Sequence, residues 1–217
     1  EELRCACRIL GVEAPRFLDY RDSGMRGSLD NKHPRAFMRA DPEEVVGRIL
    51  GIFRELLPQV VVTFGPDGGY GHPDHVAIHH HATAAWQRAG DRDRCPDLPA
   101  DPPRKLYYLA RPRSYYRRLW QTLWELGLRK EPPAEEEVQR LGLPDEQVTT
   151  HIDVADFVET KYRALRCHRT QVPPDSPWFN LSLDLLRDHL GSEFFTLAAA
   201  RGMEIAPGED DLFAGIE

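Results

Sequence analysis

Five of the nine histidines of this chain fall within one stretch, GPDGGYGHPDHVAIHHH, which runs from Gly65 to His81. Two of them, His72 and His75, stand three positions apart on either side of Asp74. Histidine is the commonest metal ligand in proteins, and zinc sites combine histidine with carboxylate. The pattern therefore favours metal chemistry, although a capped helix start is an alternative at this position.

The same stretch does not make a complete catalytic site. A catalytic zinc usually takes three protein ligands and leaves one position for water, and this stretch supplies one or two, so at least one must come from elsewhere. His75 and His79 stand four positions apart, as in H-E-x-x-H, but no glutamate base lies between them. We interpret His79 to His81 as a helix turn that faces partly into water.

The local sequence places this motif at the end of a strand. Residues 59–65, QVVVTFG, form a β-branched run that is typical of a parallel strand buried on both faces. The following glycines allow turns that β-carbons would block, and Pro73 suits the first turn of a helix that continues to Trp86. Asp74 and His75 would then lie near the positive end of the helix dipole. Ligands of open α/β sheets bind beyond the carboxyl ends of strands, which favours a functional site here.

The rest of the chain alternates helices and strands. A helix opens at Asp41-Pro42, where the aspartate can act as a cap and the proline fits the first turn. Further helices are expected at the N-terminus and over 115–126, 154–168 and 181–190, and further strands over 105–110, 148–154 and 193–198. This rhythm predicts a single α/β domain over 1–217 with a mainly parallel sheet flanked by helices. We expect 91–104 and the acidic, proline-rich segment 129–147 to be flexible, and the acidic tail 203–217 to be a solvated end.

Composition narrows the class of protein. The 217 residues are 41% hydrophobic and 29% charged, which is ordinary for a globular protein. A formal net charge of −7 argues against nucleic-acid binding, and no apolar run approaches the roughly 20 residues that span a membrane. The cysteines contain no C-x-x-C pair and do not resemble a disulfide framework, so we expect a reducing cytoplasm. They are Cys5, Cys7, Cys95 and Cys167.

Several segments together resemble the LmbE-like (PIG-L-like) zinc-dependent N-deacetylases. They occur in order from Glu1 to about Leu197: ILGV, YRDSGMRG, AFMRADPEEVV, PQVVVTF, GGYGHPDH, KYRALRCHRTQ and GSEFF. The combination of GGYGHPDH with RDSGM is the most specific part. The resemblance implies a Rossmann-like fold, one zinc ion and a small sugar substrate. The implied reaction is the removal of acetate from N-acetylglucosaminyl-inositol, in mycothiol biosynthesis, or from a similar N-acetyl sugar.

The resemblance also implies a role for each residue of the histidine motif. His75 would be a zinc ligand. His72 would contact the substrate carbonyl oxygen and act as general acid to the leaving amine, with Asp74 orienting or charging a histidine beside it. Tyr70 would donate its phenol to the tetrahedral intermediate, which is the kind of stabilisation that acyl transfer requires. Alternatively, Tyr70 packs over the loop glycines.

Two residues of RDSGM match positions that line the sugar pocket of the family. Asp22 would accept hydrogen bonds from glucosamine hydroxyls, and Met25 would contact the same sugar. The alternatives are ordinary: Asp22 could be an Asx-turn residue before Gly24, and Met25 a plain hydrophobe.

The chain departs from the family pattern at its start. The other half of the family's site is a histidine-proline-aspartate-aspartate motif after the first strand, which supplies further zinc ligands and the general base. Here the chain begins inside what reads as the next helix, and the other His-Pro pair, His33-Pro34, is followed by no carboxylate. We expect the first strand and its motif to precede Glu1 in a longer protein.

Two other functions are alternatives to the deacetylase: a mycothiol S-conjugate amidase and a catalytically incomplete sugar-binding relative. Oligomerisation is compatible with each of these functions.

Overall fold

The computed structural model describes residues 1–91, 101–203 and 208–216. The chain divides into two compact units. The first unit comprises 1–17, 113–142 and 151–193, and the second comprises 18–112, 143–150 and 194–217. Each unit is assembled from separate stretches of the chain, and the single domain expected from the sequence stays a prediction.

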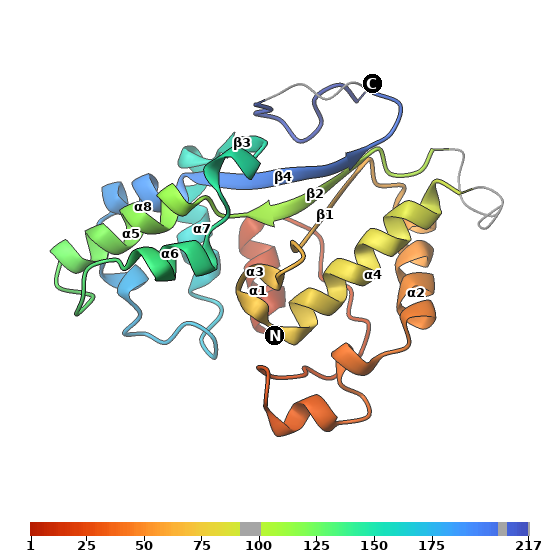
Figure 1. The fold of residues 1–217 in the computed structure, drawn as a ribbon, viewed down its shortest axis with the longest axis horizontal. Helices are drawn as coiled ribbons and strands as arrows, with labels where there is room; N and C mark the ends of the chain where they lie inside the picture. Colours follow the sequence, from red (N-terminus) through yellow and green to blue (C-terminus); the bar gives the residue numbers. More distant parts are fainter. Residues whose placement is uncertain (92–100, 204–207, 217) are drawn as a thin grey trace. The chain divides into compact units, whose positions relative to one another are not determined.

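The described chain contains a four-stranded sheet in the order β1-β2-β4-β3 (Figure 1). The strands are β1 (Val60–Thr63), β2 (Lys105–Ala110), β3 (Thr150–Asp153) and β4 (Ser192–Ala200). β1 and β2 pair in parallel, whereas β4 runs antiparallel to β2. The α/β class is confirmed, but the sheet is mixed rather than mainly parallel. An apolar run such as EFFTLA predicts a strand and carries no information about its direction.

Two long helices of the second unit, α2 (Pro42–Leu56) and α4 (Pro73–Ala89), lie side by side (Figure 1). The Asp41 carboxylate caps α2 by accepting a hydrogen bond from the Glu43 amide at 2.8 Å, as the sequence predicts. The apolar face of α2 packs in one buried cluster against Ala85 and Ala89 of α4. This packing fixes the helix whose first turn carries the histidine motif. The shorter elements of the unit are α3 (Gly68–Gly71) and the 3₁₀ helices Leu29–Lys32, Phe37–Arg39 and Asp145–Gln147.

The first unit consists mainly of helices and also contains most of β3 and the first residues of β4. Its helices are α1 (Glu2–Leu10), α5 (Arg113–Glu125), α6 (Glu135–Leu141), α7 (Val158–Leu165) and α8 (Leu183–Leu190), with 3₁₀ turns at Ala155–Phe157 and Pro177–Asn180. The helices predicted near α1, α5, α7 and α8 are confirmed. None of the helices in the described ranges combines the length and the apolar character needed to cross a membrane.

The segment 129–147, expected to be a flexible loop, contains helix α6. Val138 of this helix is buried. The Arg129 guanidinium forms an ion pair with Glu137 and lies 4.8 Å from the ring centroid of Trp120. These contacts give the segment regular structure despite its proline-rich composition, so it is not a loop throughout. Most of the other segment expected to be flexible, 91–104, lies outside the described residues.

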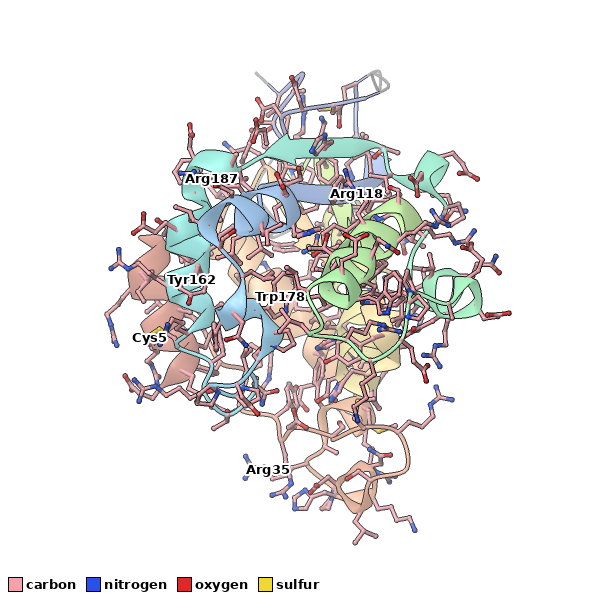
Figure 2. All side chains as sticks on the ribbon, turned by 90° about the vertical axis from the view of Figure 1, so that its left-hand side faces the viewer. Cys5, Arg35, Arg118, Tyr162, Trp178 and Arg187 are labelled. Atoms are coloured by element: carbon pink, nitrogen blue, oxygen red, sulfur yellow. A yellow bond between two sulfur atoms is a disulfide. The ribbon has the colours of Figure 1, made fainter. Side chains whose placement is uncertain are left out.

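A disulfide joins Cys5 of α1 to Cys167, which follows α7 (Figure 2). Ala6 and Ala164 pack beside it in a small buried cluster. The expectation of unpaired cysteines is wrong for these two, because partners 162 positions apart cannot be matched from spacing along the chain. The cysteine pattern therefore no longer supports a reducing compartment. Cys7 is a free thiol, and the remaining cysteine lies outside the described residues.

The acidic C-terminal segment is not solvated throughout. Glu209 is 7% exposed, and its carboxylate lies 2.6 Å from the ammonium group of Lys105, which is itself 1% exposed. The hydroxyl of Tyr107 donates to the same carboxylate, and burial raises the pKa of this phenol. A buried ionic cluster therefore holds the segment to β2, where acidic composition alone predicted a free tail.

Glu209→Ala should lower the free energy of unfolding by about 3–5 kcal/mol, because it leaves the Lys105 ammonium buried without its counter-ion. Asp210→Ala removes an exposed carboxylate from the adjacent position and should change stability by less than about 0.5 kcal/mol. Urea denaturation followed by circular dichroism gives both values. Equal losses in the two variants would contradict the buried pair.

In a protease digest made without reductant, the peptide that contains Cys5 should remain linked to the peptide that contains Cys167, as mass spectrometry can show. Reduction should separate them and lower the free energy of unfolding by about 2–4 kcal/mol, because the disulfide limits the freedom of the unfolded chain. Cys7→Ser is the control and should keep the link. Complete alkylation of Cys5 before reduction would be incompatible with the disulfide.

Candidate active site

The histidine motif lies where β1 ends and α4 begins, within the second unit. The chain turns through α3, in which Gly69 and Gly71 have positive φ angles of 78° and 84°. The Asp67 carboxylate braces this turn by accepting a hydrogen bond from the Gly69 amide at 3.0 Å. His72 is the N-cap of α4, and Pro73 occupies its first turn. The predicted order of strand, glycine-rich turn and helix is confirmed.

The backbone determines which nitrogen of His75 can bind a metal. Its Nδ1 lies 3.1 Å from the carbonyl oxygen of Gly68, and because a carbonyl only accepts, Nδ1 carries the proton and Nε2 keeps its lone pair. The ring of Phe64 stacks on the imidazole with 3.9 Å between centroids. Burial lowers the pKa of His75, which favours the neutral form. A neutral imidazole oriented by a carbonyl is the usual form of a histidine metal ligand.

His72 is held in the opposite sense. The backbone N–H of Asp74 donates to Nδ1 of His72 at 3.2 Å, so the proton of the neutral imidazole lies on Nε2. The centroids of the His72 and His75 rings are 4.9 Å apart. Tyr70, which is 58% exposed, lies edge-on to His75 with 5.1 Å between centroids. The structure thus brings two hydrogen-bond donors beside a histidine whose Nε2 keeps its lone pair.

The Asp74 carboxylate connects the motif to the segment RDSGM. Its Oδ2 accepts a hydrogen bond from the backbone N–H of Ser23 at 2.9 Å, across 51 positions of sequence. Its Oδ1 is buried and has no hydrogen-bond partner within the part of the chain that the structure describes. Potential ligand atoms of Asp22, His72 and Asp74 all lie within 4.8 Å of one another. The two segments singled out in the sequence therefore meet in space.

The two residues predicted to bind a sugar lie in one tight turn. The exposed Asp22 accepts a hydrogen bond from the Gly24 amide at 2.6 Å, so the Asx-turn alternative describes its local geometry. The same carboxylate stands beside His72, so the turn also directs it to the site. Met25 is 52% exposed. A contact of either residue with a sugar stays a prediction.

His79 and His81 are not the water-facing residues that the sequence suggested. They are 7% and 8% exposed, and of the three consecutive histidines it is His80 that faces solvent. His79 donates from Nδ1 to the carbonyl of Phe64 at 2.9 Å and so holds the residue whose ring stacks on His75. Consecutive histidines have no periodicity that could indicate which of them points inwards.

Ser23 is a site residue that sequence reasoning missed. It is fully buried, at 0% exposure. Its N–H binds Asp74, and its Oγ accepts a hydrogen bond from the Met38 amide at 3.0 Å. The only available signal was its place in RDSGM, next to Asp22.

The described residues fit part of a zinc site. His75 offers one nitrogen in the tautomer that a metal requires. Within the described chain, the group of three possible ligands that lie close together consists of Asp22, His72 and Asp74, and His75 is not part of it. A catalytic zinc usually takes three protein ligands, so for the predicted site the described residues offer one candidate ligand, His75, and not the whole set.

Residues 1–86 match the model of a protein family described as PIG-L: GlcNAc-PI de-N-acetylase. The 1D-myo-inositol 2-acetamido-2-deoxy-alpha-D-glucopyranoside deacetylase of Geodermatophilus obscurus is 40% identical over 222 residues, which cover 99% of this chain and 76% of that protein. The chain belongs to the PIG-L family of de-N-acetylases. Relatives of the same name from Thermobispora bispora and Acidothermus cellulolyticus are 39% and 40% identical; they cover 99% and 100% of this chain, which spans 77% and 73% of those proteins.

Solved structures with a similar fold include a conserved protein of Thermus thermophilus. The comparison of this chain with that protein gives a TM-score of 0.52 and 19% identity, and it covers 94% of this chain and 74% of the Thermus chain. The 4-carboxy-2-hydroxymuconate hydratase GalB of Pseudomonas putida has a TM-score of 0.53 and 18% identity, over 94% of this chain and 72% of that one. At this identity the likeness concerns the fold alone.

Gly68→Ala should destabilise the protein more than Gly71→Ala. Both glycines have positive φ, of 65° and 84°, so both variants carry the strain of a β-carbon in the left-handed region. At Gly68 the new β-carbon would also lie 2.9 Å from Cβ of His75 and 3.0 Å from the Val76 amide nitrogen, whereas at Gly71 it would meet nothing within 4 Å. We expect Gly68→Ala to lower the free energy of unfolding by about 1–3 kcal/mol more than Gly71→Ala does, as measured by urea denaturation. Equal losses of stability in the two variants would show that α4 shifts to accommodate the extra carbon at no cost in free energy.

Proposed function

We propose that this chain hydrolyses the acetamide group of N-acetylglucosaminyl-inositol and releases acetate, as a step of mycothiol biosynthesis. The observation that carries the proposal is an identity of 39–40% over nearly the whole chain to deacetylases named for this substrate. The convergence of GGYGHPDH and RDSGM at one place supports it, because the proposed reaction needs its proton donors beside the sugar-binding residues.

In this proposal His75 is one ligand of a zinc ion, and the other ligands lie outside the described residues. When bound, zinc lowers the pKa of a coordinated water to about 7 and polarises an amide carbonyl. The contribution of this chain is the orientation of the ligand. The Gly68 carbonyl keeps the proton on Nδ1 of His75, so that Nε2 retains the lone pair a metal needs.

His72 serves as the proton donor of the proposed reaction. In its neutral form the Nε2–H of His72 can donate a hydrogen bond to the oxyanion that develops on the substrate carbonyl. To act as general acid, the ring takes up a second proton on Nδ1 in place of the hydrogen bond from the Asp74 amide, and the imidazolium then passes its Nε2 proton to the amine nitrogen as the C–N bond breaks. Asp74 positions the ring through its own backbone N–H. The half-exposed phenol of Tyr70, on a turn between two glycines, is the second donor to the oxyanion.

Asp22 and Met25 form the sugar subsite. The Asp22 oxygen that is not engaged by the Gly24 amide can accept a hydrogen bond from a glucosamine hydroxyl. Met25 offers an exposed apolar side chain on the same turn. These contacts would hold the sugar so that its acetamide faces His72.

The test uses the full-length protein loaded with zinc, and measures acetate release together with bound metal. His75→Ala should lose zinc and activity together. His72→Ala should retain zinc and lower kcat by about 100-fold or more, which is the usual loss when a donor to an oxyanion is removed. His80→Ala, on the exposed side of α4, is the control and should match the wild type.

The wild-type protein must release acetate from N-acetylglucosaminyl-inositol for the proposal to stand. Cleavage of a mycothiol S-conjugate in its place would identify an amidase, and sugar binding without turnover would identify a non-catalytic relative. Retention of zinc in His75→Ala with loss of zinc in His72→Ala would reverse the two assigned roles.

A further inference from the structure

Asn31 organises the turn 22–27 from its centre. Its side-chain Nδ2 donates to the carbonyl oxygens of Ser23 at 2.5 Å and Met25 at 3.2 Å, with a longer contact of 3.3 Å to the carbonyl between them. Its Oδ1 accepts a hydrogen bond from the Gly27 amide at 2.8 Å. One half-buried side chain therefore satisfies groups at both ends of the turn that contains Asp22.

This arrangement depends on the amide chemistry of Asn31. Three carbonyl oxygens that converge on one point repel one another unless a donor lies between them. Partly buried carbonyls that have no donor also destabilise the folded state. Asparagine supplies a donor and an acceptor on one short side chain, whereas aspartate of the same shape supplies acceptors alone. The turn is tight as well, since Gly24 and Gly27 have positive φ angles of 67° and 91°.

The same contacts extend to the histidine motif through Ser23. The carbonyl of Ser23 binds Asn31, while its N–H binds the Asp74 carboxylate at 2.9 Å. Ser23 is fully buried, so water does not replace either partner without a rearrangement of the turn. A displacement of Asn31 therefore moves Ser23, which is hydrogen-bonded directly to the histidine motif.

We propose that Asn31 is a positioning residue that sets the affinity for the sugar by holding Asp22 and Met25 in their places beside His72. This inference rests on the proposed function, in which those two residues bind the substrate. The side-chain hydrogen bonds of Asn31 go to the turn, so its loss should weaken substrate binding more than it slows the chemical step.

The kinetic test uses the full-length, zinc-loaded enzyme with N-acetylglucosaminyl-inositol. Asn31→Ala should raise KM by about 10-fold and change kcat by less than about threefold, with the zinc content unchanged. Asn31→Asp keeps the size of the side chain but sets a carboxylate against the carbonyl oxygens, so KM should rise at least as much. Asn180→Ala, which removes an exposed asparagine from the first unit, is the control and should leave both constants unchanged.

Amide hydrogen exchange gives a second readout that needs no turnover. In Asn31→Ala the amides of Ser23 and Gly27 should exchange about 10-fold faster or more, because the bonds that hold the turn are lost. In Asn31→Asp the Gly27 amide should stay protected by the remaining acceptor, while the Ser23 amide should not.

An unchanged KM in both variants would overturn the inference, and so would faster exchange spread evenly over the second unit, which would mean that Asn31 stabilises the fold in general. If the wild-type enzyme releases no acetate, the proposed function fails and the link to sugar affinity fails with it. The exchange result would then still decide whether Asn31 holds the turn.

Discussion

The candidate site depends on one hydrogen bond, from the buried amide of Ser23 to the carboxylate of Asp74. Neither of the segments that it joins is a site alone, because RDSGM contains no imidazole and HPDH lacks the turn that carries Asp22 and Met25. The other oxygen of Asp74 has no partner in the described chain, so a break in this bond would leave a partly buried carboxylate poorly satisfied. The packing of α2 on α4 matters for the same reason, since it holds the helix that presents Asp74.

The parts of the fold that could be predicted from the sequence have local causes. The Asp41 cap, the prolines that start α2 and α4, and the β-branched run of β1 act within a few residues, and the structure has two helices and a strand at these places. The direction of β4, the partner of Cys5 and the burial of Glu209 could not be predicted, because each depends on a contact between residues far apart in the sequence.

The candidate site shows the same division. His72 and His75 stand out because histidine, aspartate and glycine at this spacing point to chemistry and resemble a family. Ser23 and Asn31 do not stand out, because serine and asparagine are ordinary residues of a loop. Their importance follows only from the fold, which buries the serine and surrounds the asparagine with backbone carbonyls.

The two histidines of the motif carry their protons on opposite nitrogens, and in both cases the partner that decides this is a main-chain atom. The backbone conformation, and not the identity of a neighbouring side chain, thus determines which ring nitrogen of each histidine carries the proton. Substitution of a neighbouring side chain that leaves the turn at Gly68 intact should therefore leave the proton of each ring on the same nitrogen.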